Sequence, residues 1–206
     1  MHAVTARELL LASQNAGKLE EMRQLLAGMA FRVRGPRELG LHEAPAETGR
    51  TFAENAALKA LHYAARSGLL TVADDSGLSV DALHGGPGLY SSRFGGEGAT
   101  DRDRNRLLLE RLRGVPPERR GARFTSAVAV AGDRRILFQA EESVEGRIGE
   151  GERGGSGFGY DPLFFYPPLG RTFGELPREE KDRVSHRGKA FARLREFLRE
   201  LAASPS

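Results

Sequence analysis

The sequence predicts an α/β protein with two lobes, in which helices flank a long, mixed and twisted sheet and a central cleft separates the lobes. Short apolar runs typical of buried strands alternate with segments of helical periodicity in the first half of the chain. Two long apolar runs in the second half are joined by Gly132 and Asp133, which predicts an antiparallel hairpin. No linker or internal repeat interrupts the 206 residues, so we expect a single two-lobed domain over 1–206.

The first elements follow from periodicity. Leu9–Ala12 is an apolar run that predicts the first buried strand. Leucine and methionine then recur at helical spacing, which predicts a helix over about 16–30. Alternation over Phe31–Arg34 predicts a second strand, and the Gly-, Pro- and Glu-rich residues 35–50 predict a loop.

An alanine-rich helix follows this loop. Thr51 and Glu54 have capping-box spacing and open the helix, which runs to about Ser67 and is stopped by Gly68. The apolar run Leu69–Ala73 predicts the next buried strand, which we expect to end at a pair of aspartates.

The rest of the chain is predicted to hold a long glycine-rich loop, a helix, three strands and a C-terminal helix. In that order they cover 84–99, 100–113, 123–131, 136–140, 142–148 and 188–202. A long irregular segment inside a compact domain usually carries function, which marks 84–99 as a functional loop.

Composition excludes several classes. The chain has no cysteine, so disulfides, zinc–thiolate sites and cysteine nucleophiles are ruled out. No apolar run approaches the ~20 residues that span a bilayer, and we expect a cytoplasmic protein with no membrane partner. Arginines are dispersed among acids and the net charge is only +3, which argues against a nucleic-acid partner but suits a cationic cleft for a polyphosphate.

Asp74 and Asp75, followed by Ser76 and Gly77, are the most informative residues. Neighbouring side chains on a strand point to opposite faces, so these carboxylates need neutralising from two directions by a divalent cation, lysines or both. Carboxylates at the mouth of a strand commonly hold Mg²⁺ against phosphates. The alternative is that the four residues simply form a turn, which Asp, Ser and Gly all favour.

The segment Ser13–Lys18 lies where a strand passes into a helix. Free N–H groups, the helix dipole and the charge of Lys18 suit a phosphate. It is no Walker loop, because Ala12 and Leu19 stand where that motif needs Gly and Ser or Thr. The alternative is an ordinary helix cap with a surface lysine.

Three other positions remain open between structure and chemistry. Lys59, on the alanine-rich helix near Glu47, either extends to solvent or points toward the aspartates or a phosphate. The segment Gly154–Pro162 offers aromatic rings for a nucleobase, or else packs them in the core. The segment Lys181–Arg187 carries donors for a base edge, or else caps the last helix through Ser185.

Five segments in order resemble one family, the inosine/xanthosine triphosphate pyrophosphatases, also called Ham1-like. They are Ser-x-Asn-x-x-Lys at 13–18, Glu-Thr-Gly-x-Thr-Phe-x-Glu-Asn-Ala-x-x-Lys-Ala at 47–60, Ala-Asp-Asp-Ser-Gly-Leu at 73–78, Gly-Phe-Gly-Tyr-Asp-Pro-x-Phe at 157–164 and Ser-His-Arg at 185–187. The resemblance covers roughly residues 9–198. It implies a two-lobed homodimer that hydrolyses ITP, dITP and XTP to the monophosphate and pyrophosphate with Mg²⁺, and so keeps deaminated purines out of DNA and RNA.

The resemblance also implies a role for each motif residue. Glu47 and Asp75 would bind Mg²⁺, with Asp74 a weaker candidate, while Asp75 would also act as the base toward water. The catalytic residues would be Asp75, Lys18 and Lys59. The substrate-binding residues would be Ser13, Gln14, Asn15, Ala16, Gly17, Lys18, Ser76, Phe158, Gly159, Tyr160, Asp161, Lys181, His186 and Arg187.

Two other classes fit less well. A Maf-like nucleotide pyrophosphatase usually opens with Ser-x-Ser-Pro-Arg-Arg after its first strand, where this chain has Ser13–Lys18. A basic nucleic-acid-binding module predicts a clustered stripe of Arg and Lys with interleaved aromatics, which the sequence lacks.

Overall fold

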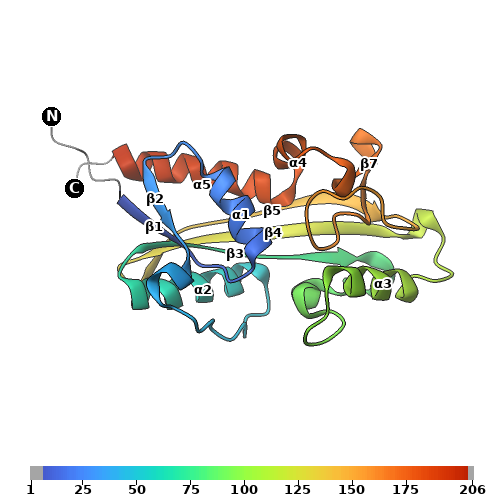
Figure 1. Ribbon diagram of the computed structural model, residues 1–206, viewed down its shortest axis with the longest axis horizontal. Helices are drawn as coiled ribbons and strands as arrows, with labels where there is room; N and C mark the ends of the chain where they lie inside the picture. The colour runs from blue at the N-terminus through green and yellow to red at the C-terminus, as the bar shows by residue number, and fades with distance from the viewer. Residues whose placement is uncertain (1–6, 204–206) are drawn as a thin grey trace. The chain divides into compact units, whose positions relative to one another are not determined.

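The computed structural model describes residues 7–203 (Figure 1). These residues contain a seven-stranded mixed sheet. The sheet order is β2-β1-β3-β4-β5-β6-β7. The strands are β1 (Arg7–Leu11), β2 (Phe31–Arg34), β3 (Leu70–Val80), β4 (Gly121–Gly132), β5 (Arg135–Ile148), β6 (Phe164–Tyr166) and β7 (Arg171–Thr172). β1 is parallel to β2 and β3, whereas β6 is antiparallel to β5 and β7, which confirms the predicted mixed α/β class.

Five α-helices accompany these strands in the described residues. They are α1 (Ala16–Leu25), α2 (Phe52–Ser67), α3 (Asp101–Arg111), α4 (Arg178–Val184) and α5 (His186–Ala203). None of them is long and apolar enough to cross a membrane.

The described chain divides into two compact units. Unit 1 contains residues 7–75, 127–141 and 190–203, and unit 2 contains 76–126 and 142–189. The single two-lobed domain over 1–206 stays a prediction, and its first six and last three residues lie outside the described part.

Unit 1 has a core on each face of its strands because strand side chains alternate. Leu9 and Leu11 pack with residues of α1 and α5, whereas Leu10 and Ala12 pack with α2. Figure 1 shows α5 and α2 on opposite sides of these strands. The near-continuous apolar run that predicted a buried strand is therefore explained by helices covering both faces.

The ends of α2 follow its sequence signals. The Thr51 hydroxyl accepts a hydrogen bond from the Glu54 main-chain N–H at 3.1 Å, and Gly68 ends the helix at φ 68°. The Glu54 carboxylate accepts from the Arg50 N–H at 2.6 Å. This bond ties the preceding loop to the start of the helix.

Unit 2 has its own apolar core. Leu108 of α3 and Leu112, its C-cap residue, pack in one buried cluster with Phe124 of β4, Phe164 of β6 and Phe173. The Phe124 and Phe164 rings lie 4.6 Å apart. These contacts give α3 a fixed place within the unit.

The prediction that the third strand ends at the two aspartates was wrong, and so was the turn alternative. β3 continues through them to Val80, and Asp74 and Asp75 are only 1% and 6% exposed. β3 lies between β1 and β4 in the sheet order. Pairing with neighbouring strands satisfies its main-chain groups, and this tertiary context overrides the turn preference of Asp-Asp-Ser-Gly.

Other boundaries also differ from the predictions. α1 ends at Leu25, because Leu26 forms its C-cap and Gly28 takes a left-handed φ of 77°. β5 is one strand where two had been predicted, and α5 begins at His186, two residues early. α4, β6 and β7 are too short to show a clear period in sequence.

Candidate active site

β3 presents its two aspartates to opposite faces of unit 1. Val72 packs in the cluster that contains α1 and α5, whereas Ala73 packs in the cluster that contains α2. Because side chains alternate along a strand, Asp74 lies on the α1 side and Asp75 on the α2 side. Each carboxylate meets a different lysine there.

Asp74 pairs with Lys18 at the start of α1. The Nζ–Oδ2 distance is 3.0 Å, and the Asp74 side chain is fully buried. Asn15 is the N-cap of α1, and its Oδ1 accepts from the Lys18 main-chain N–H at 2.9 Å. The charge of Lys18 and the positive end of the helix therefore lie at one place, a favourable arrangement for an anion.

The rest of the Ser13–Lys18 segment is held at its ends and exposed in the middle. Ser13 Oγ accepts from the Asn15 N–H at 3.3 Å, and Gln14 Nε2 donates to the His42 carbonyl at 2.6 Å. Ala16 and Gly17 form the first turn of α1. Asn15 therefore does cap the helix, and its phosphate-binding role stays a prediction.

Asp75, Lys59 and Glu47 form the second cluster. Lys59 Nζ lies 2.6 Å from Asp75 Oδ1 and 3.2 Å from Glu47 Oε1. Of the two orientations predicted for Lys59, the structure therefore places it toward the carboxylates.

Burial and charge shift both groups of the central pair. Burial raises the pKa of the Asp75 carboxyl, and the nearby Lys59 and Lys18 only partly offset this. Burial alone would lower the pKa of Lys59, but Asp75 and Glu47 outweigh it and raise that pKa. Lys59 is therefore a permanent cation at neutral pH, and Asp75 is a stronger base than an exposed aspartate.

Asn55 belongs to this cluster and was missing from the predicted site residues. Its Nδ2 lies 3.3 Å from Asp75 Oδ2, and its Oδ1 accepts from the Gly49 N–H at 2.8 Å. A Cβ on Gly49 would lie 2.6 Å from that oxygen, so glycine is required there. The available signal was the spacing of Asn55 and Lys59, which places them one helical turn apart on the same face of α2.

The carboxylates fit a magnesium ion only partly enclosed by protein. Glu47 and Asp75 converge on one point, whereas Asp74 faces the other side of β3. No group of three or more His, Asp or Glu residues in the described part of the chain could hold a metal. Two convergent carboxylates suit Mg²⁺, which commonly takes one or two and fills its other positions with water and phosphate oxygens.

In unit 2, Asp161 organises the loop that carries Phe158. Asp161 Oδ2 accepts from the Phe158 main-chain N–H at 2.9 Å and from Lys181 Nζ at 2.7 Å. Asp161 and Lys181 are both nearly fully buried. A Cβ on Gly157 would overlap the same carboxylate, and Gly157 has a φ of 77°. The glycine-rich composition of this loop therefore allows a close approach to Asp161.

Two cations face the Phe158 ring. Lys181 Nζ and the Arg187 guanidinium carbon lie 5.3 Å and 5.4 Å from its centre. Arg187 Nη2 donates to Ser76 Oγ at 2.7 Å, and the His186 ring stacks on Phe124 at 4.7 Å. The structure thus brings together Ser76, Phe158, Lys181 and Arg187, all predicted for substrate binding.

Tyr160 and Ser185 have structural partners. The Tyr160 hydroxyl donates to the Ser91 carbonyl at 2.8 Å, and burial raises the pKa of that hydroxyl. Ser185 Oγ accepts from the Gly188 N–H at 3.0 Å, so the predicted cap of the last helix is present. A Cβ on Gly188 would overlap the Asp182 carbonyl oxygen. The absence of a side chain at Gly188 therefore allows α4 and α5 to lie in close contact.

A family model described as the Ham1 family matches residues 9–197. The chain belongs to the Ham1 family. This confirms the resemblance that the five segments indicated.

Curated relatives cover nearly the whole chain. A dITP/XTP pyrophosphatase of Methylococcus capsulatus is 48% identical over 197 residues, which is 95% of this chain and 98% of the relative. A dITP/XTP pyrophosphatase of Thermus thermophilus is 47% identical over 193 residues, which is 94% of this chain and 92% of the relative.

Solved structures of the Ham1 family have the same fold. A HAM1 protein from Coxiella burnetii has a TM-score of 0.85 at 41% identity, covering 94% of this chain and 99% of that one. The Staphylococcus aureus Ham1 protein has a TM-score of 0.83 at 36% identity, covering 95% and 100%.

Proposed function

We propose that this Ham1-family chain hydrolyses the non-standard purine nucleoside triphosphates ITP, dITP and XTP to the monophosphate and pyrophosphate. The observation that carries the proposal is the pair of lysine–aspartate contacts on the two faces of β3. A triphosphate carries about four negative charges, so carboxylates can act on it only beside cations. The names of the curated relatives support dITP and XTP as substrates.

The residues of unit 1 would handle the triphosphate. Lys18 and the N-terminus of α1 bind phosphate oxygens, and Lys59 neutralises further charge. Asp75 takes a proton from the attacking water as general base. Pyrophosphate leaves with its charge stabilised by Lys18.

We also propose that Glu47 and Asp75 hold Mg²⁺, whereas Asp74, the weaker candidate, lies on the other face of β3 and pairs with Lys18. When bound, the ion would neutralise charge on the phosphates and lower the pKa of water. The two carboxylates already share a cation in Lys59, which supports this assignment.

The residues of unit 2 would read the base. The Phe158 ring offers a stacking face worth about 1–3 kcal/mol. Arg187, Lys181 and His186 supply donors that suit the 6-oxo group of hypoxanthine and xanthine. Opposite the 6-amino group of adenine a buried donor is left unpaired, at about 1–3 kcal/mol.

A panel of nucleoside triphosphates with pyrophosphate detection, with and without Mg²⁺, tests the proposal. We expect pyrophosphate from dITP, ITP and XTP and little from ATP. Diphosphate plus orthophosphate would place the attack on another phosphorus and contradict it. The resemblance also implies a homodimer, which light scattering of the purified protein would test.

A further inference from the structure

We propose that Asp101 and Asn105 of α3 are positioning residues that fix the Phe158 ring by holding the main chain of Gly159, and so tune base recognition. This inference rests on the proposed function, in which Phe158 stacks on the base.

Two side chains of α3 bind the two polar main-chain groups of Gly159. The Gly159 N–H donates to Asp101 Oδ2 at 2.7 Å, and its carbonyl accepts from Asn105 Nδ2 at 3.1 Å. Residues four apart lie on one face of a helix, so one face of α3 holds both groups. Gly159 has a φ of 62°, a conformation that glycine adopts without strain.

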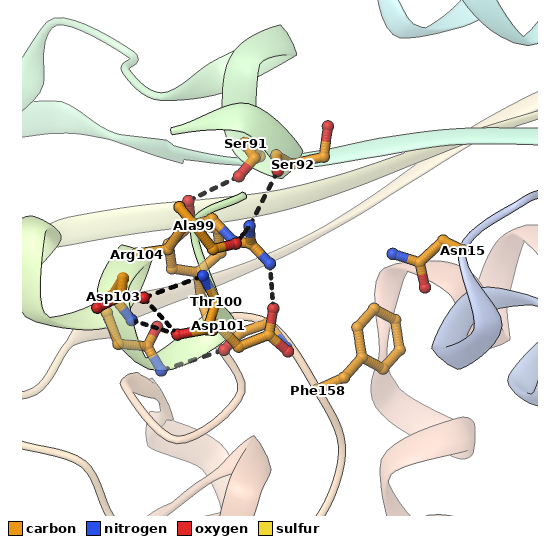
Figure 2. Close-up of polar contacts among 12 residues, drawn as sticks. Asn15, Ser91, Ser92, Ala99, Thr100, Asp101, Asp103, Arg104 and Phe158 are labelled. Carbon is orange, nitrogen blue, oxygen red and sulfur yellow. Dashed lines mark hydrogen bonds and ion pairs between the residues drawn. The ribbon is translucent and has the colours of Figure 1, made fainter. Parts of the chain in front are cut away.

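Asp101 is itself held in place by Arg104 (Figure 2). One guanidinium nitrogen of Arg104 pairs with Asp101 Oδ1, and the other donates to the carbonyls of Ala99 and Ser92 at 2.6 Å and 3.1 Å. The second carboxylate oxygen of Asp101, Oδ2, is thereby directed at the Gly159 N–H. Arg104 thus acts on Gly159 through Asp101.

Asn105 is anchored more deeply. It is 2% exposed, and its Nδ2 also donates to Glu152 Oε1 at 2.9 Å. Its neighbour Leu108 is fully buried in the core of unit 2. The core therefore fixes α3, and α3 in turn fixes Gly159.

The Phe158 ring thus has anchors on both sides along the chain. Its own N–H is held by Asp161, and the next residue is held by Asp101 and Asn105. A side chain that stacks on a ligand needs such support, because loosely held neighbouring residues would let it occupy a range of positions. Displacements of about 1 Å can cost about 10²-fold in activity.

Binding and kinetics of Asp101→Ala and Asn105→Ala test the inference. We expect the KM for dITP to rise about tenfold, within the range of one base-stacking contact, with kcat changed less than about twofold. Asp103→Ala is the matched control: it removes the capping box of the same helix, where Asp103 accepts from the Thr100 N–H, and Asp103 is not a partner of Gly159. It should lower Tm and leave the KM unchanged.

A double-mutant cycle with Phe158→Ala separates positioning from general stability. In the Phe158→Ala protein, Asp101→Ala should add no further rise in KM, because the ring that it positions is gone. Equal KM effects in Asp101→Ala and Asp103→Ala, or full additivity with Phe158→Ala, would overturn the inference.

Equilibrium binding of dITP, measured in proteins that carry Asp75→Asn, tests the positioning role without depending on turnover. Adding Asp101→Ala to Asp75→Asn should raise the Kd for dITP about tenfold. If the wild-type protein does not hydrolyse dITP but Asp101→Ala still raises the Kd, the proposed function is contradicted and the positioning role is supported. An active wild-type protein with unchanged Kd and KM in the variants would overturn the positioning role alone.

Discussion

Lys59 Nζ lies within 3.2 Å of both Glu47 Oε1 and Asp75 Oδ1, so one ammonium joins the two carboxylates that we propose as magnesium ligands. Without a cation between them, the two neighbouring carboxylates would repel each other. Lys59 therefore keeps the pair together, and Asn55 holds Asp75 from a second direction.

Asp75→Asn should reduce kcat by about 10²–10⁴-fold, because the general base is lost while the side-chain shape is kept. Nucleotide binding, measured by titration calorimetry, should remain. Asp133→Asn is the control, since Asp133 is exposed in a hairpin turn at φ 49°, where asparagine is well tolerated. Turnover retained by Asp75→Asn would remove Asp75 from its role as base.

Removing the metal with a chelator should abolish turnover. Glu47→Gln should raise the Mg²⁺ concentration needed for half-maximal activity by about 10-fold or more, because one charged ligand is lost. A magnesium titration of initial rates measures this. Glu43→Gln, an exposed change in the same loop, should leave the titration unchanged. If both variants titrate like wild type, Glu47 is not a ligand.

In the metal-free protein, the pKa of the Asp75 carboxyl should lie above 3.8, the ordinary value of aspartate, because burial raises it. NMR titration of the metal-free protein measures this pKa, and Asp75 should lose its negative charge as the pH falls through the raised value. Lys59→Met should raise the pKa of Asp75 further, because the charge of Lys59 lowers it. An Asp75 pKa that is unchanged in Lys59→Met would contradict this coupling.

Arg187→Ala should narrow the preference for ITP over ATP by about tenfold, because the donor opposite the 6-oxo group is removed. The ratio of the two kcat/KM values measures this. Arg183→Ala removes an exposed arginine from α4 and should leave the ratio as in wild type. An equal fall for both nucleotides in Arg187→Ala would place discrimination elsewhere.

Gly188→Ala should destabilise the protein by about 1–3 kcal/mol, because its Cβ would overlap the Asp182 carbonyl oxygen between α4 and α5. This steric destabilisation should exceed the stability that a helix usually gains when glycine is replaced by alanine. Gly151→Ala, where a Cβ meets nothing within 4 Å, should leave Tm nearly unchanged. Similar melting curves for both would contradict this contact.

The neighbourhood of the aspartates shows where sequence reasoning reached its limit. Alternation on a strand was enough to predict that Asp74 and Asp75 face opposite ways and need two sources of positive charge. That β3 continues for five residues beyond them depends on neighbouring strands far away in the chain, which local turn preference does not represent. Asn55 was overlooked for a similar reason, because its partners Gly49 and Asp75 meet only in the folded unit.

The sequence by itself determined the class, the family and the residue types of the site, because periodicity, capping signals and ordered motifs are local properties of the chain. Tertiary structure alone decided which charges meet. It assigned Lys18 to Asp74 and Lys59 to Asp75, and it placed the face of α3 that carries Asp101 and Asn105 against Gly159. Such pairings join residues 16 to 58 positions apart, and they are set by how helices and strands pack rather than by any pattern within a single element.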